Sequence, residues 1–325
     1  MSMRLVLIAA AALLTQGAIR PAAAEPFPSR PITFVVPYPA GGNVDVSARL
    51  LQSGIGDSLG QPILIDNKPG GAGFIGGLNV AHAAPDGHTV FVASNGPVVL
   101  APLVMTNPAY QWDQVFAPVS SISFATTVLL IRPTLKVKSI QDLLAYAKAN
   151  PKEFTMAIGG AGSINHLVSE LFQQETGIKW LQVQYRGNAP AINDLIGGHV
   201  DAYIGQLSDS IASIQAGSVK AIAVIGPERT PLLPGVATTG EQGYPAIVAS
   251  TFNGMLAPKG TPRDVVEKLS AAVRAGLAKQ PVIDGFKKIG SEAKGSTPDE
   301  FTAFLKGETA KWREVVTRGN IHITD

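Results

Sequence analysis

The chain has 325 residues, enough for two lobes with separate cores or for one large α/β domain. Its 26 basic and 24 acidic residues nearly balance, no basic block occurs and aromatic residues make up only 6%, so the composition argues against nucleic-acid binding. The absence of cysteine excludes disulfides, thiolate metal sites, cysteine nucleophiles and a lipid-modified cysteine.

The first residues have the pattern of a secretory signal peptide. A basic start at Met1–Arg4 precedes the apolar run Leu5–Leu14, and the small residues Ala22–Ala24 follow. The apolar run has about ten residues, whereas a membrane-spanning helix needs about twenty. We therefore expect residues 1–24 to be removed near Ala24 and the mature protein to be soluble and exported.

Strand and helix patterns then alternate along the chain. After the first strand, apolar residues recur every three or four positions, which predicts a helix with one buried face. The predicted strands are Ile32–Val36, Pro62–Asp66, His88–Ala93, Thr127–Ile131, Phe154–Ile158, Leu181–Tyr185, Val200–Ile204 and Val219–Ile225. This alternation predicts an α/β fold with a mostly parallel sheet and flanking helices in each lobe.

The sequence also indicates how the chain divides. Gly226–Tyr244 is rich in proline, glycine and threonine, so we expect irregular chain there and a return crossing between lobes near its end. Thr261–Pro262 and the capping-box sequence Thr297–Glu300 predict C-terminal helices that pack back on the first lobe. We expect residues 25–124 and 249–325 to form lobe 1, and residues 125–248 to form lobe 2.

Two glycine-rich turns, Tyr38–Asp45 and Ile158–Asn165, each lie between a strand and a helix. Glycine lets the backbone approach a ligand closely, and the first helical turn offers unpaired N–H groups and the positive end of the helix dipole. The repetition of this arrangement predicts one anion shared by two lobes. A small carboxylate fits this description.

In the first turn, the candidate ligand contacts are Tyr38, Ala40, Gly41, Gly42 and Asn43. Asn43 is also a candidate N-cap, and the Tyr38 ring could flank a ligand. Asp45 belongs to the first helical turn, where the helix dipole favours a carboxylate, so we interpret it as structural. An ordinary strand-to-helix turn is the alternative interpretation.

In the second turn, the candidates are Gly160, Ser163, Asn165 and His166. The Ser163 hydroxyl could act as the helix N-cap, as a donor to the ligand, or as both. His166 precedes Glu170 by one helical turn, but two side chains do not complete a metal site and a surface pair explains them better. We predict no metal.

The ends of other predicted strands supply further candidates, because ligands of α/β proteins bind beyond the carboxyl ends of the strands. These candidates are Ser94, Tyr185, Arg186, Gln206, Ser208 and Asp209. Arg186 could pair with a second carboxylate, which would suit a dicarboxylate, or it could simply be solvated. Asp209 could receive an amino group.

Gly71–Gly76 fits the dinucleotide-binding pattern G-x-G-x-x-G, but its context does not fit. Lys68 and Pro69 separate it from the preceding strand, and no acidic residue occurs from Gly87 to Gln111, where a ribose partner is expected. We therefore predict no cofactor and interpret this segment as a turn and helix start facing the hinge.

A secreted hydrolase is the alternative of another class. It would use Ser163 as nucleophile, His166 or His199 as base, and Asp201 or Asp209 to orient the base. The sequence around Ser163 lacks the G-x-S-x-G nucleophile elbow, and Ser163 and His166 fall on one helical turn. We therefore favour a binding protein that is not an enzyme.

Several segments together resemble the substrate-binding proteins of tripartite tricarboxylate transporters, also called the Bug family. The similar segments are Tyr38–Arg49, Asn67–Gly73, Pro85–Thr89, Gly160–Leu167, Tyr185–Gly187, Asp194–Asp201 and Leu256–Pro262. They follow the family order, and the resemblance covers essentially the whole mature chain.

The resemblance implies a two-lobed periplasmic binding protein of type II, the Venus-flytrap fold. In that family a small organic acid binds between the lobes, held by backbone N–H groups and ordered waters of the two glycine-containing loops, and is delivered to a membrane permease. A monomer suits the hinge motion best. The identity of the acid, aliphatic or aromatic, stays open, as does service to a sensor in place of a permease.

Overall fold

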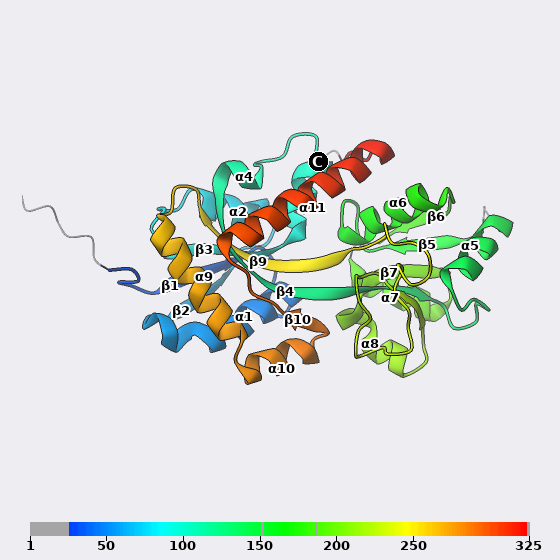
Figure 1. The fold of residues 1–325 in the computed structure, drawn as a ribbon. Helices are drawn as coiled ribbons and strands as arrows, with labels where there is room; N and C mark the ends of the chain where they lie inside the picture. Colours follow the sequence, from blue (N-terminus) through cyan, green and yellow to red (C-terminus); the bar gives the residue numbers. More distant parts are fainter. Residues whose placement is uncertain (1–25, 151–152, 186, 324–325) are drawn as a thin grey trace, which may run out of the picture.

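The computed structural model describes residues 26–150, 153–185 and 187–323, so the predicted signal peptide lies outside the described residues. These residues form two lobes connected by long strands (Figure 1). None of the helices within these ranges is long and apolar enough to cross a bilayer.

The first lobe contains both chain-terminal parts of the described sequence. Before the crossing its elements are β1 (Ile32–Val36), α1 (Asn43–Leu59), β2 (Ile63–Asn67), the short helix η1 (Gly71–Gly73), α2 (Phe74–Ala81), β3 (Thr89–Ser94), the π-helical turn η2 (Gly96–Leu100), α3 (Ala101–Val104) and α4 (Trp112–Val115). After the return its elements are β9 (Ser250–Pro258), α9 (Arg263–Leu277), α10 (Gln280–Lys288), β10 (Ser291–Ala293) and α11 (Pro298–Gly319).

The second lobe follows the long strand β4 (Phe116–Ile131). Its elements are α5 (Ile140–Ala149), β5 (Thr155–Ile158), α6 (Ile164–Thr176), β6 (Leu181–Gln184), α7 (Asn188–Gly197), β7 (Ala202–Gln206), α8 (Leu207–Gln215) and β8 (Lys220–Val224). No helix or strand occupies residues 226–249, as the composition of Gly226–Tyr244 predicted.

Parallel pairing is found where strand–helix–strand units were predicted. β1 pairs in parallel with β2 and β3, and β5 pairs in parallel with β6 and β7. The crossing strands β4 and β9 add antiparallel pairs, to each other and to β3, β7, β8 and β10. The predicted strand Thr127–Ile131 is therefore only the second half of β4, and β9 and β10 were not predicted.

Strand β4 changes partner between Thr126 and Thr127. Thr126 pairs with Ser250 of β9, whereas Thr127 pairs with Gln206 of β7. The chain therefore passes from the sheet of one lobe to the sheet of the other at this point, and β9 begins beside it. Two adjacent strands that cross in this way form the connection about which lobes of such a fold can rotate.

Helix α1 buries the face that its apolar spacing predicted. Val44, Ala48, Leu51, Ile55 and Leu59 are all buried in a core cluster shared with β1, β3 and α9. The helix ends at Gly60, whose φ of 65° lies in the left-handed region that glycine adopts readily. The 3.6-residue period of apolar side chains was therefore a correct indication of both the helix and its buried side.

Helix α11 begins at the predicted capping box, in which the Thr297 and Glu300 side chains each bond to the other residue's backbone N–H. It packs on the first lobe as expected, but its end also contacts α6 of the second lobe (Figure 1). There, Gln174 Nε2 donates to Val315 O at 2.9 Å, and Arg318 Nη1 lies 3.1 Å from Glu175 Oε1. Helix α11 therefore connects the lobes at a second place.

Candidate functional site

A cleft of about 620 Å³ lies between the lobes, within the size range of small-molecule sites. Residues of both lobes line it. They are Pro37, Tyr38, Pro39, Pro69, Gly70, Gly71, Ala72, Gly73, Ser94, Asn95, Gly96, Leu100, Ala101, Val104, Met105, Ala161, Gly162, Ser163, Ile164, Asn165, Asn188, Gln206, Thr251 and Ile323.

Five of the predicted site residues are in this lining: Tyr38, Ser94, Ser163, Asn165 and Gln206. Others are close in sequence but are not in the lining: Ala40, Gly41, Gly42, Asn43, Gly160, His166, Tyr185, Ser208 and Asp209. Arg186 lies outside the described residues. Direct contact of these other residues with a ligand stays a prediction.

The first glycine-rich turn is held by Asp45, as its structural interpretation predicted. Asp45 Oδ2 accepts from the Gly41 N–H at 2.8 Å and from Arg49 Nε at 2.9 Å. Burial of Asp45 raises its carboxyl pKa, but hydrogen bonds from Arg49, Gly41 and Asn67 outweigh that effect and lower it. The turn therefore keeps an ionised carboxylate of its own at the start of α1.

The prediction that Asn43 caps α1 was wrong. Gly42 is the N-cap, with extended φ and ψ of −74° and 167°, and Asn43 is the first helical residue. The Asn43 side chain turns to β9 instead, where its Oδ1 accepts from Asn253 Nδ2 at 2.8 Å. Because Asp45 already satisfies the Gly41 N–H, the start of α1 does not need a capping side chain to hold the turn.

The second glycine-rich turn is capped by Ser163, as predicted. The Ser163 hydroxyl accepts from the His166 N–H at 3.3 Å and donates to the Gly160 carbonyl at 2.7 Å. His166 holds the same turn from the other side, because its Nδ1 accepts the Gly162 N–H at 3.1 Å. These bonds present Ser163 and the helix start that follows it to the cleft.

The Gly162 bond requires neutral His166, since a protonated Nδ1 would place one N–H against another. Burial lowers the pKa of His166, although Glu170 on the same helix acts in the opposite direction. The folded pKa therefore lies below the unfolded value of about 6.5. The neutral side chain stabilises the fold above that pH, and this contribution is lost as pH falls from about 6.5 through the folded pKa.

We expect the His166→Asn variant to lose part of this pH dependence, because the Asn Oδ1 can accept the Gly162 N–H without titrating. The measurement is the free energy of unfolding of both proteins from pH 8 to pH 5. The wild type should lose more stability than the variant over the acid part of that range. Equal losses in the two proteins would show that the Gly162 bond does not depend on His166 ionisation.

Strand ends bring the polar side chains of the cleft together. Tyr38 OH and Ser94 Oγ are 2.8 Å apart, joining the ends of β1 and β3. In lobe 2, Asn165 Nδ2 donates to the Ile204 carbonyl at 2.7 Å. Gln206 Nε2 donates to Thr251 Oγ1 at 3.0 Å, connecting β7 to β9 across the lobes. The cleft therefore includes the place where the chain crosses.

Two other predicted residues bond to side chains of lobe 2. Asp209 accepts from Asn188 Nδ2 at 2.8 Å, and Asn188 itself lines the cleft. Tyr185 OH donates to Asp194 Oδ2 at 2.6 Å, and burial together with this carboxylate raises the pKa of Tyr185 to about 12. Asp209 and Tyr185 thus position neighbouring groups in lobe 2.

The sequence reasoning did not find several lining residues. Gly71–Gly73 belong to the segment Gly71–Gly76, which was interpreted as a turn and helix start facing the hinge. It is a turn and helix start, but together with Gly70 its first residues line the cleft. The π-helical turn η2 supplies Gly96 and Leu100, where a Cβ on Gly96 would lie 2.9 Å from Tyr38 OH. Its only sequence signal was Gly96–Pro97, separated from the end of β3 by one residue, and π-helical turns are frequent at functional sites.

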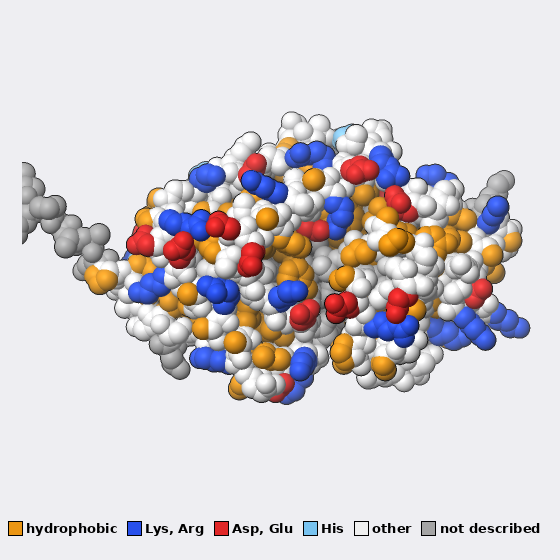
Figure 2. Space-filling view, in the orientation of Figure 1, with side chains coloured by type: hydrophobic (Ala, Val, Ile, Leu, Met, Phe, Trp, Pro, Cys, Tyr) orange, Lys and Arg blue, Asp and Glu red, His pale blue; other side chains and the backbone are white. Residues whose placement is uncertain are grey.

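No Lys, Arg, His, Asp or Glu is among the described residues that line the cleft. On the face of the molecule that Figure 2 shows, by contrast, positive and negative side chains are interspersed over both lobes. An anion in the cleft would therefore be held by neutral donors, namely backbone N–H groups, hydroxyls and side-chain amides. Such donors keep a carboxylate ionised without a partner of opposite charge.

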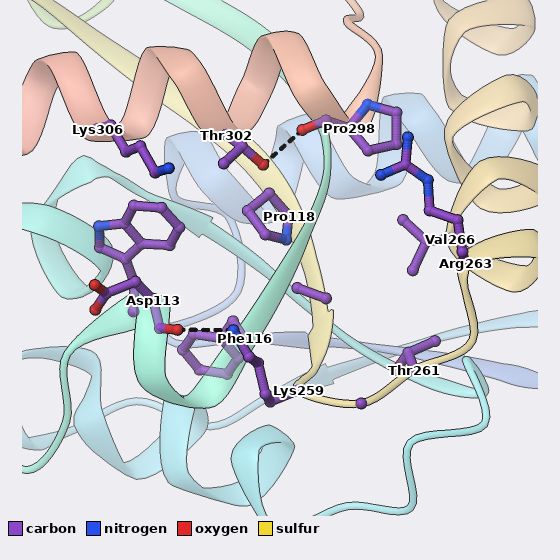
Figure 3. A pocket seen from close by; sticks show the side chains of 13 residues that line it. Asp113, Phe116, Pro118, Lys259, Thr261, Arg263, Val266, Pro298, Thr302 and Lys306 are labelled. Carbon is purple, nitrogen blue, oxygen red and sulfur yellow. Dashed lines mark hydrogen bonds between the residues drawn. The ribbon is translucent and has the colours of Figure 1, made fainter.

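A second pocket, of about 500 Å³, lies within lobe 1 beside α9 and α11 (Figure 3). Two of its cations already have partners: Lys259 Nζ donates to the Asp113 carbonyl at 3.0 Å, and Arg263 pairs with Glu267 and Asp299. No residue of the second lobe contributes to its lining. Of the two pockets, only the cleft between the lobes could respond to lobe movement.

Residues 47–321 match the family described as the tripartite tricarboxylate transporter family receptor. The chain belongs to this family. BugT of Bordetella pertussis is 35% identical over 314 residues, which are 96% of this chain and 96% of BugT. The resemblance to the Bug family that the sequence segments indicated is thereby confirmed.

Solved structures of similar chains agree with this receptor family. An R. palustris protein solved with adipate is 32% identical, with a TM-score of 0.80 over 91% of this chain and 99% of that one. MatC of Rhodopseudomonas palustris, solved with bound malate, is 32% identical, with a TM-score of 0.76 over 89% of this chain and all of its own. The predicted two-lobed α/β fold of a periplasmic binding protein is therefore confirmed.

Proposed function

We propose that this receptor captures a small organic carboxylate between its lobes in the periplasm and delivers it to a tripartite tricarboxylate-type membrane permease. The observation that carries the proposal is the cleft itself, which both lobes line with glycine-rich turns and neutral donors. Adipate and malate are bound by structurally similar proteins, which supports an organic acid as the ligand.

Glycine-rich turns before two helices supply the donors for the carboxylate. In lobe 2, Ala161–Ser163 lead into α6 and line the cleft together with its first residues, Ile164 and Asn165, and in lobe 1, Gly70–Gly73 lead into α2. Helix starts present unpaired N–H groups and a partial positive charge, which suit an anion. Hydroxyl and amide side chains of Ser94, Asn95 and Asn188 can add to them.

The donors are divided between lobes, so the closed form binds the ligand better than the open form does. Lobe 1 alone would offer Gly70–Gly73 and Ser94, and lobe 2 alone would offer the start of α6 and Asn188. A ligand that bonds to both sets shifts the equilibrium toward closure by its difference in affinity. The change of partner in β4 at Thr126 and Thr127 supports our proposed division into residues 25–124 with 249–325 and residues 125–248.

The geometry around Ser163 supports binding without catalysis. The hydroxyl of Ser163 donates to the Gly160 carbonyl, and Nδ1 of His166 accepts the Gly162 N–H. Asp201 bonds to Arg132 Nε at 2.7 Å and to Thr155. A hydrolase needs its nucleophile bonded to its base and the base bonded to a carboxylate. In this structure Ser163 Oγ, His166 Nδ1 and the Asp201 carboxylate each bond to a group outside such a triad.

The test is a panel of mono-, di- and tricarboxylates, measured by thermal shift and calorimetry on the purified monomer that we expect. At least one acid at a hundred times its Kd should raise the melting temperature by roughly 5–10 °C. The acid should be recovered unchanged by NMR, with both the wild type and Ser163→Ala. Failure of every acid to bind would overturn the proposal, and turnover that Ser163→Ala abolishes would support the hydrolase instead.

Delivery needs a separate measurement. The receptor is added to proteoliposomes that contain the permease subunits encoded beside it, and uptake of the bound acid is followed. Uptake that depends on the receptor is expected. Binding of the acid without any receptor-dependent uptake would favour service to a sensor.

A further inference from the structure

One part of the cleft is a continuous group of apolar side chains, which we call the apolar wall. Three separate chain segments contribute to it: the η2–α3 turn, the start of α6 and the C-terminal segment. Its residues are Leu100, Ala101, Val104, Met105, Ile164 and Ile323. Binding of a carboxylate by backbone N–H groups, as proposed above, does not by itself require apolar side chains at this place.

The C-terminal segment is fixed in place by backbone hydrogen bonds. The Ile323 N–H donates to the Val104 carbonyl at 2.8 Å, and the Ile323 carbonyl accepts from the Thr106 N–H at 3.4 Å. Ile323 and Met105 form a parallel β-bridge. Ile323 therefore occupies a defined position in the cleft, although it is near the end of the chain and follows helix α11.

The apolar wall also contacts the second glycine-rich turn. A Cβ placed on Gly162 would lie 2.6 Å from Ile323 Cδ1 and 2.8 Å from Val104 Cγ2, so these side chains fill the space beside that glycine. Val104, 2% exposed, and Ile164, 7% exposed, belong to the hydrophobic core, and the half-buried side chains of Met105 and Ile323 pack against this core at the cleft. A ligand held by the turn through its carboxylate would place its next atoms near this wall.

An apolar wall suits hydrocarbon and penalises a second ionised group. A carboxylate placed against it without donors would lose its hydration with no replacement. No cationic side chain is among the described residues that line the cleft, and Arg186 lies outside the described residues. Burial of methylenes or an aromatic ring, by contrast, is favourable in proportion to the apolar area removed from water.

Building on the function proposed above, we propose that the preferred ligand is a monocarboxylate with an apolar body, an aliphatic chain or an aromatic ring, and that Ile323 is a specificity-determining residue. The carboxylate occupies the neutral donors at the starts of α6 and α2. The hydrocarbon lies on the apolar wall.

Calorimetry with matched acids tests this inference. Hexanoate and adipate have the same number of carbons and differ in one terminal group, so hexanoate should bind at least about tenfold more tightly. Within the series from butyrate to hexanoate, affinity should rise about fourfold per methylene, the gain expected for burial of one such group. Benzoate should likewise bind more tightly than terephthalate.

Substitutions at the C-terminus assign the effect to Ile323. Ile323→Ser should weaken hexanoate by about tenfold and leave butyrate nearly unchanged. The matched control is His322→Ser, because His322 is exposed, is not part of the cleft lining and neighbours Ile323 in extended chain. It should leave every affinity unchanged. Circular dichroism spectra of both variants report whether the fold is kept.

Two results would overturn the inference. If adipate or malate binds at least as tightly as hexanoate, the cleft does not prefer a monocarboxylate, and loss of that binding in Arg186→Met would assign the second carboxylate to Arg186. If Ile323→Ser and His322→Ser have the same effect on hexanoate, Ile323 does not determine specificity. In either case the proposed function stands, whereas absence of binding by every acid would overturn that function as well.

Discussion

Replacing Gly162 by valine is expected to weaken binding of the tightest acid in the carboxylate panel by at least 100-fold, about 2.7 kcal/mol. Gly162 has a φ of 70°, which a β-branched residue adopts only with strain. Its new Cβ would also lie 2.6 Å from Ile323 Cδ1 and 2.8 Å from Val104 Cγ2. Relief of that clash must move either the turn or the apolar wall, and both line the cleft. Calorimetric titration gives the loss.

Gly177→Val is the matched control for this experiment. Gly177 ends the same helix, α6, with a nearly identical φ of 68°, but a Cβ there meets no neighbouring atom within 4 Å. Both variants should lose stability from backbone strain, on the order of 1–2 kcal/mol. Only Gly162→Val should lose affinity. A comparable loss of affinity in Gly177→Val would mean that strain in α6, and not contact in the cleft, is responsible.

The parts of the fold that depend on nearby residues could be predicted from the sequence. The apolar spacing of α1 gave its buried face, and Thr297–Glu300 gave the capping box at the start of α11. Ser163 was recognised as the cap of α6, because a serine directly before an amphipathic run has a local reason to be there. Each of these features is decided within a few turns of the chain.

The long crossing strands could not be predicted in the same way. The first half of β4 pairs with β9, more than a hundred residues later, and its buried pattern has no simple alternation. This half contains Pro118 and the buried residues Ser120, Ser121 and Ser123, so it forms neither a continuous apolar run nor an apolar–polar alternation. The sequence pattern therefore predicts only Thr127–Ile131, the second half of β4.

The residues that line the cleft were likewise predicted only where a local sequence pattern marked them. Tyr38, Ser94, Ser163, Asn165 and Gln206 were found because they follow strands or begin helices. Thr251 and Ile323 line the same cleft from β9 and from the end of the chain, and no local pattern marks either of them. Their positions depend on a strand crossing and on a β-bridge to Met105, which are set by tertiary pairing.

Replacing Trp312 by alanine is expected to destabilise the protein by about 3–5 kcal/mol, the usual cost of removing a fully buried aromatic side chain. Trp312 has no exposed surface and belongs to the core cluster that extends from lobe 1 into lobe 2. Its Nε1 donates to Glu308 Oε2 at 2.8 Å, so truncation also leaves a partly buried carboxylate without that donor. Guanidinium unfolding followed by circular dichroism gives the free energy.

Gly307→Ala in the same helix provides the control for Trp312→Ala. Gly307 is exposed, and an added Cβ meets no atom within 4 Å, so the alanine should stabilise α11 by roughly 0.5–1 kcal/mol. If Trp312→Ala lowers the free energy of unfolding and Gly307→Ala raises it, the loss at Trp312 comes from the shared core and not from substitution in α11 as such. Since α11 contacts both lobes, the loss should appear as one transition of lower midpoint. A loss below about 1 kcal/mol in Trp312→Ala would contradict a core shared through this helix.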